Sequence, residues 1–376
     1  MESIRYSARR FAQVLGLTPQ ELSEAEARGP LAKLRSSAPQ RTLYTIEDLS
    51  SARAALGRFP PRRPMRRQLF LNFKGGTGKT SVSTSYAFRL AEMGHRVLVI
   101  DLDSQGHASK CLGIAGDEAE RTLFEALIKK VPLEQIIVRT GMPGLDLVPS
   151  NLRMSTIDLS LMPLAAREFR LRNALKEIEA EYDYAVLDAP PSFGLLNLNA
   201  LMAAHDLFVP VLADFLSFHG LKLLFETVHS LEEDLEHVLD HIFIVVNAYN
   251  ATFRIAKEAR EALEKHYTEF LLKQVIRQCT KFAQASSEGI PIFAYDPESK
   301  GARDIQGVLD EVRERIGDPV KLKLAPAAGP RKALEERALP ASPVAKADRP
   351  QHPVEERALP ASPVAKARRP QHLVEG

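Results

Sequence analysis

A short glycine-rich stretch, Lys74-Gly-Gly-Thr-Gly-Lys-Thr80, places the strongest constraint on the fold of this 376-residue chain. An apolar segment, residues 68–73, precedes it, and residues 81–93 follow with the spacing of a helix. Glycines in a strand-to-helix turn leave several backbone N–H groups free and bring a positive helix end to the same point. Such a turn binds phosphate groups. The stretch therefore predicts a nucleotide site on an α/β fold.

The residues of this loop have distinct expected tasks. Lys79 would reach the β- and γ-phosphates as a point charge, and the Thr80 hydroxyl would ligate the Mg²⁺ ion that bridges them. Lys74 adds a second cation, and two cations this close repel unless an anion lies between them. Nucleotide contacts are expected from Gly75, Gly76, Thr77, Gly78, Lys79, Thr80 and Ser81.

Two acidic motifs follow predicted strands further along the chain. Asp101-Leu-Asp-Ser-Gln-Gly106 comes after the apolar residues 96–100, and Asp188-Ala-Pro-Pro-Ser-Phe-Gly194 comes after the apolar residues 184–187. Ligands gather at the carboxyl ends of parallel strands, so Asp188 is placed to hold Mg²⁺ through its water shell. The alternative interpretation of the first motif is an acidic loop that only caps its strand.

Together, these three motifs resemble, in order and spacing, those of the ParA/MinD family of ATPases, whose deviant Walker A loop carries the extra lysine. The resemblance covers roughly residues 67–317. It implies a doubly wound α/β domain with a mostly parallel sheet, slow ATP hydrolysis and an ATP-dependent homodimer. In that dimer Lys74 would reach the phosphates bound by the partner.

The resemblance also assigns roles to individual side chains. Lys74 and Lys79 would stabilise charge on the phosphoryl group, and Asp103 would orient the attacking water. Mg²⁺ would be held by Thr80, Asp101 and Asp188. Asn247, at the end of the predicted strand 241–246, is similar to the family residue that reads the adenine edge. Its alternative role is that of a turn-forming Asn at a strand end.

A third part of the resemblance concerns DNA. The stretch 290–302 is similar to the ParA C-terminal region, where basic residues of the ATP-bound dimer contact the DNA backbone without reading its sequence. Arg277 stands where the family usually has a proline near the adenine. A solvated surface is the alternative interpretation of these charges. The candidate DNA-binding residues are Arg254, Lys273, Arg277, Lys281, Lys300 and Arg303.

The net charge of +2 hides an uneven distribution. Residues 1–68 hold 13 Lys and Arg against 6 Asp and Glu, and residues 321–376 hold 11 against 6. The middle of the chain is therefore acidic, with 26 against 36. If the protein binds nucleic acid, either the basic ends supply much of the attraction or a local patch overcomes an acidic body.

We expect four segments. Residues 1–57 should be helical, with Thr18 and Thr45 as N-caps, and resemble the MerR-type helix-turn-helix of longer plasmid ParA proteins. The acidic second helix leaves open a helical element that serves only dimerisation or packing. Residues 58–66 read as a basic Pro-rich linker and residues 67–318 as the ATPase. Residues 319–376 should be a disordered tail with two near-identical 20-residue units, 335–354 and 355–374.

Cellular context follows from composition. The two cysteines, Cys111 and Cys279, form no metal-binding motif, which favours a reducing compartment and excludes iron–sulfur relatives. No apolar run is long enough to span a membrane, and the tail lacks an amphipathic membrane helix. We therefore expect a cytoplasmic protein without membrane contact, and the resemblance to ParA proteins implies that it associates with the nucleoid.

The resemblance implies an ATPase for plasmid or chromosome segregation. Its ATP dimer would bind DNA non-specifically, and a ParB-like adaptor would stimulate hydrolysis and release. Two alternatives stay open at this point. One is a transcriptional autoregulator whose N-terminal segment reads an operator, and the other is a ParA-like positioner of a protein cargo.

Overall fold

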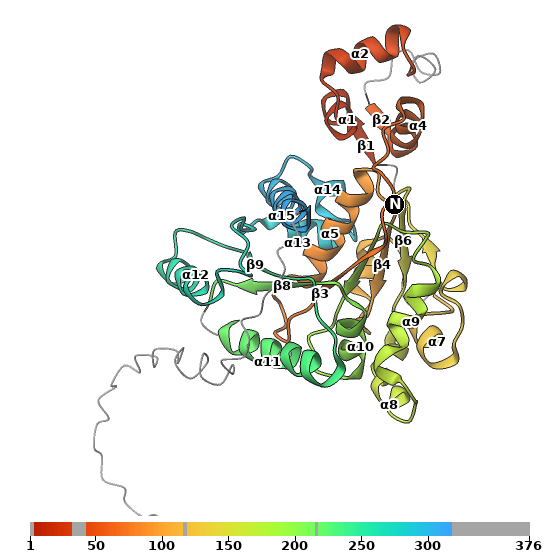
Figure 1. The fold of residues 1–376 in the computed structure, drawn as a ribbon. Coiled ribbons are helices and arrows are strands. Elements are labelled where there is room, and N and C mark those ends of the chain that lie inside the picture. The colour runs from red at the N-terminus through yellow and green to blue at the C-terminus, as the bar shows by residue number, and fades with distance from the viewer. Residues whose placement is uncertain (1–3, 32–42, 116–118, 215–216, 318–376) are drawn as a thin grey trace, which may run out of the picture. The chain divides into compact units, whose positions relative to one another are not determined.

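The computed structural model describes residues 4–31, 43–115, 119–214 and 217–317 (Figure 1). All of them belong to one compact unit, residues 1–324. The repeated tail predicted for residues 319–376 lies outside the described residues.

A seven-stranded sheet forms the centre of the described ATPase region. Its order is β5-β6-β4-β7-β3-β8-β9, and every neighbouring pair is parallel except β5 and β6. This confirms the predicted doubly wound, mostly parallel α/β fold. The strands are β3 Arg66–Phe70, β4 Val97–Asp101, β5 Val138–Arg139, β6 Leu145–Val148, β7 Tyr184–Asp188, β8 Asp206–Leu212 and β9 His241–Asn247.

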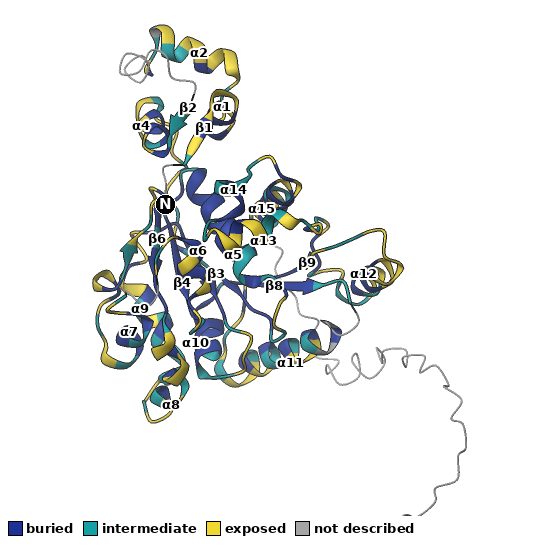
Figure 2. Ribbon diagram, turned by 180° about the vertical axis from the view of Figure 1, so that it is seen from behind, coloured by how far each residue is buried: buried dark blue, intermediate teal, exposed yellow. Residues whose placement is uncertain are grey.

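Helices cover both faces of this sheet (Figure 1). Helices α5, α13, α14 and α15 gather on one face, while α7 to α11 lie on the other. The central strands of the sheet and most of α5 are buried, whereas the edge strand β5 is not (Figure 2). The helices are α5 Lys79–Glu92, α6 His107–Cys111, α7 Leu123–Lys129, α8 Ile157–Leu161, α9 Arg170–Glu177, α10 Leu195–Ala203, α11 Ser217–Leu235, α12 Arg254–Tyr267, α13 Thr280–Ser287, α14 Ile292–Tyr295 and α15 Lys300–Gly317.

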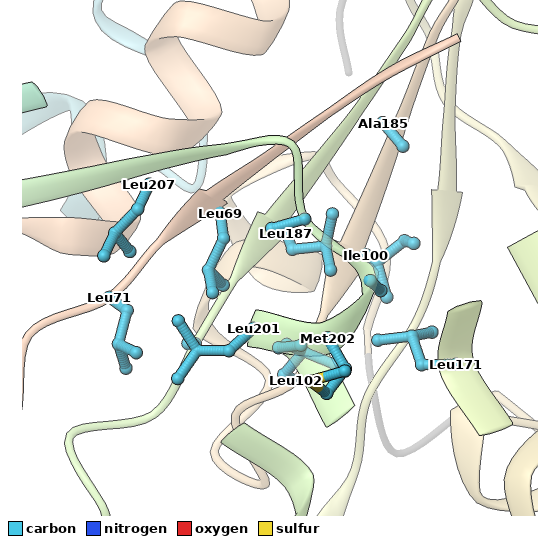
Figure 3. Packing of buried hydrophobic residues seen from close by; sticks show 14 of the residues in the cluster. Leu69, Leu71, Ile100, Leu102, Leu171, Ala185, Leu187, Leu201, Met202 and Leu207 are labelled. Atoms are coloured by element: carbon cyan, nitrogen blue, oxygen red, sulfur yellow. The ribbon is translucent and has the colours of Figure 1, made fainter. Parts of the chain in front are cut away.

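Successive side chains of a buried strand point to opposite faces of the sheet, so each strand contributes to both hydrophobic cores. In β3 and the residue after it, Leu69 and Leu71 join the cluster beneath α10, whereas Phe70 joins the cluster under α5. Figure 3 shows Leu69 and Leu71 near Leu201 and Met202 of α10. Each buried side chain of this size contributes roughly 1.5–3 kcal/mol. Because both faces are covered, the strands read as continuous apolar runs.

Residues 4–31 and 43–57, here called the N-terminal segment, have the predicted helices and caps. Thr18 and Thr45 each cap a helix and form a capping box with the acidic residue three positions on. Strand β1 pairs antiparallel with β2. The elements are β1 Arg5–Ser7, α1 Ala8–Leu15, α2 Pro19–Arg28, β2 Leu43–Thr45 and α4 Ile46–Leu56. The MerR-type assignment stays a prediction.

The sequence pattern predicts a strand at residues 271–276 and a long amphipathic helix at residues 164–180, and the structure differs from both predictions. The expected strand 271–276 is only bridged to β9, because the N–H groups of Lys273 and Gln274 donate to the carboxylate of Glu311 and not to a sheet partner. The expected helix 164–180 is shortened to α9, since Ala166 adopts φ +49° and a 3₁₀ turn at residues 167–169 precedes the helix. Among the described helices, none combines the length and apolar character needed to cross a membrane.

We predict that His95 makes stability depend on pH. Burial, followed by the charge of Arg63, lowers the pKa of His95 to about 4, against 6.5 for a free imidazole. The unfolded chain therefore takes up a proton that the folded chain cannot, and up to about 3 kcal/mol of stability, complete above pH 6.5, is lost as the pH falls to 4. His95→Phe keeps an aromatic ring against Tyr184 and should remove the part of the acid-induced loss of stability that comes from His95.

Urea unfolding at several pH values measures the effect. His205, whose pKa is also about 4, is expected to retain its own contribution in the variant. The exposed His107, changed to Phe, controls for the loss of an imidazole. An equal pH dependence in wild type and His95→Phe would contradict the prediction.

Candidate nucleotide site

Strand register brings the three predicted motifs to one edge of the sheet. Asp188, the last residue of β7, is paired with Phe70 at the end of β3 on one side and with Asp101 at the end of β4 on the other. The glycine-rich loop leaves β3 directly above this point and leads into α5. Strand β3 also separates β7 from β8, so the loop lies where the winding of the sheet reverses.

The loop itself has the backbone of a phosphate cradle. Gly76 and Gly78 have φ of +72° and +86°, which a residue with a Cβ rarely adopts. Asn247, at the end of β9, donates from Nδ2 to the Thr77 carbonyl at 2.8 Å. The predicted adenine-reading residue is therefore in contact with the loop, although its role toward a base stays a prediction.

Asp188 lies among hydroxyl groups at the base of the loop. Its oxygens accept from Thr80 Oγ1 at 2.7 Å and from Ser83 Oγ at 2.9 Å. The Asp188 side chain is fully buried, and this burial raises its pKa to about 6, with the two hydroxyl hydrogen bonds opposing the rise. A hydroxyl and a carboxylate at this distance are the protein groups that hold Mg²⁺ beside a nucleotide.

The composition of this site fits Mg²⁺ better than a metal held by protein alone. Within the described ranges, no cluster of three His, Cys, Asp or Glu side chains is placed to bind a metal. Mg²⁺ characteristically takes one or two protein oxygens and completes its shell with water and phosphate oxygens. Thr80 and Asp188 supply that kind of partial set.

Asp101 and Asp103 occupy the next loop. Asp101 is fully buried, and its oxygens accept from the N–H and Oγ of Ser109, at 2.8 and 2.7 Å, and from the N–H of Asp103 at 3.1 Å. Burial, and then the charge of Asp188, raises the pKa of Asp101 to about 7. Asp103 is partly exposed and accepts from the N–H of Gln105 at 3.0 Å. These contacts give the acidic loop a defined shape.

The two lysines of the loop have different surroundings. Lys79 is buried, which lowers the pKa of its ammonium, while Asp188 and Asp103 act in the opposite direction. Its Nζ donates to the Lys74 carbonyl at 3.2 Å. Lys74 Nζ forms an ion pair with both oxygens of Asp214, at 3.0 and 2.8 Å. In this conformation Lys74 is thus paired within its own chain.

The candidate DNA-binding residues do not form a uniform group. Arg277, whose side chain stays exposed, makes a two-pronged ion pair with the buried Asp304 of α15, with a closest contact of 2.7 Å, so its charge is partly neutralised within the chain. Lys281 is half-buried, 3.9 Å from Asp296, and its Nζ lies 5.4 Å from the ring centre of Tyr295. Arg254 pairs with Glu258, and the remaining three, Lys273, Lys300 and Arg303, are exposed.

Sequence reasoning missed four residues of this site. Ser83 lies one helical turn after Thr80, so the spacing could have indicated that both hydroxyls reach the carboxylate of Asp188. Ser109 is eight residues from Asp101, Asn72 accepts from the Lys74 N–H at 2.9 Å, and Asp214 lies 140 positions from Lys74. No local pattern marks Asp214, because its contact with Lys74 depends on the neighbouring strands β3 and β8.

We predict unequal effects of alanine at two glycines of the loop. A Cβ at Gly78 would lie 2.1 Å from Asn247 Nδ2 and would also strain a positive φ, whereas a Cβ at Gly75 would meet nothing within 4 Å. Gly78→Ala should therefore destabilise the fold by about 1–3 kcal/mol, and Gly75→Ala by less than about 1 kcal/mol. Urea unfolding measures both, and a larger loss for Gly75→Ala would show that the loop has another conformation.

The chain is similar to known proteins over most of its length. Residues 65–241 match a family described as AAA domain. The chain is 64% identical over 316 residues to the cell division protein PomZ of Myxococcus xanthus, covering 84% of this chain and 95% of PomZ. It is 32% identical over 257 residues to the chromosome partitioning protein ParA of Caulobacter vibrioides, covering 68% and 96%.

A solved structure shows the same fold. The cobyrinic acid a,c-diamide synthase of Mycobacterium smegmatis, with bound ATP analog and magnesium, is 27% identical and has a TM-score of 0.60, covering 68% of this chain and 96% of its own. PomZ and ParA are relatives of the kind that the glycine-rich loop and the two acidic motifs predicted. The family predicted from those motifs is thereby confirmed: the chain belongs to the ParA/MinD family of partition ATPases.

Proposed function

We propose that this chain is a ParA-type ATPase that uses ATP-dependent dimerisation to position or segregate a cargo along DNA. The observation that carries the proposal is that Lys79, Thr80 and Asp188 lie together at the glycine-rich loop. Asp103 is close enough for its charge to act on Lys79. Family membership and this geometry together support ATP and Mg²⁺ as the ligands.

The chemistry would be hydrolysis of the terminal phosphoryl group. The buried Lys79 would place a positive charge where negative charge accumulates in the transition state. Bound Mg²⁺ would supply further charge neutralisation on the phosphate oxygens, held by Thr80 and Asp188. The partly exposed Asp103 would accept a hydrogen bond from the attacking water. Asp101, whose oxygens already accept three protein hydrogen bonds, would act on the metal through its waters.

Lys74 supports the dimer part of the proposal. Its ion pair with Asp214 is about one-third exposed at both partners, and a pair of this kind is worth only about 0–1 kcal/mol. A triphosphate carried by a second copy of the chain would offer Lys74 a stronger anionic partner. The lysine can therefore exchange an intramolecular partner for an intermolecular one when ATP is bound.

We predict that Lys79→Gln abolishes ATP-dependent dimerisation. The substitution keeps a polar side chain, one atom shorter than that of lysine, but removes the charge that would meet the phosphates. Sedimentation velocity with a slowly hydrolysed ATP analogue should show dimers for the wild type and monomers for the variant. The exposed Lys110, changed to Gln, is a matched control outside the loop. A normal ATP dimer of Lys79→Gln would overturn the assignment of the site.

The DNA surface we propose lies on α13, α14 and α15. A Cβ at Gly301 would lie 2.7 Å from Phe282 and 2.6 Å from Ile292, so the start of α15 packs closely against the other two helices. This packing brings Lys281 and Lys300, the neighbours of Phe282 and Gly301, into one region. Arg303 is exposed one turn further along α15. Arg277 contributes less, because Asp304 already neutralises it.

We predict that Lys281→Ala weakens DNA binding without changing nucleotide binding. Losing one phosphate contact should lower the affinity for random-sequence duplex several-fold and reduce the slope of log K against log salt by about one. The titration compares ADP with the ATP analogue, and Lys176→Ala, on the exposed side of α9, is the control. Binding that is indifferent to nucleotide, or equal in both variants, would move the DNA contact elsewhere.

Cargo and adaptor belong to the same proposal. The relatives include a chromosome partitioning protein and, at twice the identity, a cell division protein. The higher identity favours a protein assembly of the division machinery as cargo, with segregation of plasmid or chromosome as the second candidate. A ParB-like or functionally equivalent adaptor would stimulate hydrolysis, and the protein would act in the cytoplasm on the nucleoid.

A further inference from the structure

A buried ionic cluster joins the N-terminal segment to the helix that carries the nucleotide loop. Glu92, at the C-terminal end of α5, is completely buried, and its Oε2 accepts from Arg10 Nη2 of α1 at 2.9 Å. Arg89 donates to the same oxygen. Arg53 of α4 donates to the backbone carbonyls of Glu92 and Val14. The N-terminal segment is therefore attached through charged groups that are all at least nine-tenths buried.

An aromatic ring completes this cluster. Two guanidinium groups share one carboxylate, which leaves an excess positive charge in a buried place. Phe293 of α14 lies beneath both, with the Cζ atoms of Arg10 and Arg89 at 5.9 and 5.5 Å from its ring centre. The negative face of an aromatic ring attracts cations, and more strongly where water is excluded. Phe293 therefore adds to the stability of the arrangement.

The same cluster reaches the proposed DNA surface. Phe293 is two residues from Tyr295, over whose ring Lys281 lies. Arg89 also donates from Nε to Gln306 of α15, one turn after Arg303. The residues that hold the N-terminal segment are therefore in contact with both α14 and α15.

We propose that Arg10 is a positioning residue through which the N-terminal segment holds α14, and with it Lys281, in the arrangement that binds DNA. This inference rests on the proposed DNA-binding function. It gives the N-terminal segment a task within the ATPase that is separate from reading an operator, and it makes DNA affinity depend on how that segment is packed.

The charges of the cluster indicate which variant tests the idea. Arg10→Ala leaves Glu92 paired with Arg89, so no buried charge is left without a partner. Removing Glu92 would leave two buried guanidiniums facing each other and would destabilise the whole region. Arg9→Ala removes the same charge from the exposed side of α1 and is the matched control.

Hydrogen exchange on the full-length protein is the first readout. In Arg10→Ala, amides of residues 290–305 should exchange at least about threefold faster than in the wild type, whereas Arg9→Ala should leave them unchanged. Arg10→Lys, which restores a cation beside Glu92, should recover most of the protection. Faster exchange confined to residues 4–57 would overturn the proposal, because the N-terminal segment would then pack without positioning α14.

The second readout is a double-mutant cycle on DNA affinity with the ATP analogue bound. If Arg10 acts through Lys281, Arg10→Ala should weaken DNA binding several-fold in the wild type and have little further effect in Lys281→Ala. Additive losses would overturn the proposal. Altered exchange at residues 290–305 with unchanged DNA affinity in both single variants would support the contact but overturn the DNA role of this surface.

Phe293→Leu tests the contact from the other side, should Arg10→Ala disturb the folding of α1. Leucine keeps the residue apolar but removes the ring beneath the two guanidiniums. Amides of residues 5–15 should then exchange faster, because a coupling between two sites acts in both directions. Unchanged exchange in residues 5–15 would show that the ring does not hold the N-terminal segment.

Discussion

The register of three parallel strands, β4, β7 and β3, is the constraint on which the site depends. Pairing of Asp188 with Phe70 and with Asp101 brings the nucleotide loop and both acidic motifs to the same level of the sheet. A shift of one residue would turn each side chain to the opposite face and separate the motifs. The two apolar cores on either face of these strands hold the register. Packing of the cores therefore determines which functional groups meet at this edge of the sheet.

Burial of charge is the second theme of the molecule. The carboxylates of Asp101 and Asp188 are completely buried, which raises their pKa, and hydroxyl and backbone N–H groups around them only partly offset the cost. Lys79 is buried beside them, and its pKa is lowered. A site with such groups already desolvated is suited to a ligand that brings both phosphate charge and a divalent cation, since each would then meet an opposite charge in a low dielectric.

At the C-terminal end of α5, buried charged groups attach the N-terminal segment to the ATPase region. Glu92 binds arginines from α1 and from α5 itself, and Arg53 binds the backbone at the same place. The nucleotide loop and the N-terminal segment are thus attached to opposite ends of one buried helix. Sequence reasoning left open whether the first 57 residues read DNA or support packing. The buried contacts give the packing alternative a specific structural basis, and DNA reading by this segment stays a prediction.

By itself, the sequence determined the family, the α/β class, the helix caps at Thr18 and Thr45, and the residues of the loop, because these features are local: a glycine with positive φ, a capping box or an apolar run is encoded within a few positions. Only the tertiary structure decided that Asp214 pairs with Lys74, that Asp304 neutralises Arg277, and that Glu92 receives Arg10. Those partners are separated by 140, 27 and 82 positions. Their contacts arise from which strands and helices become neighbours, and no local pattern records that.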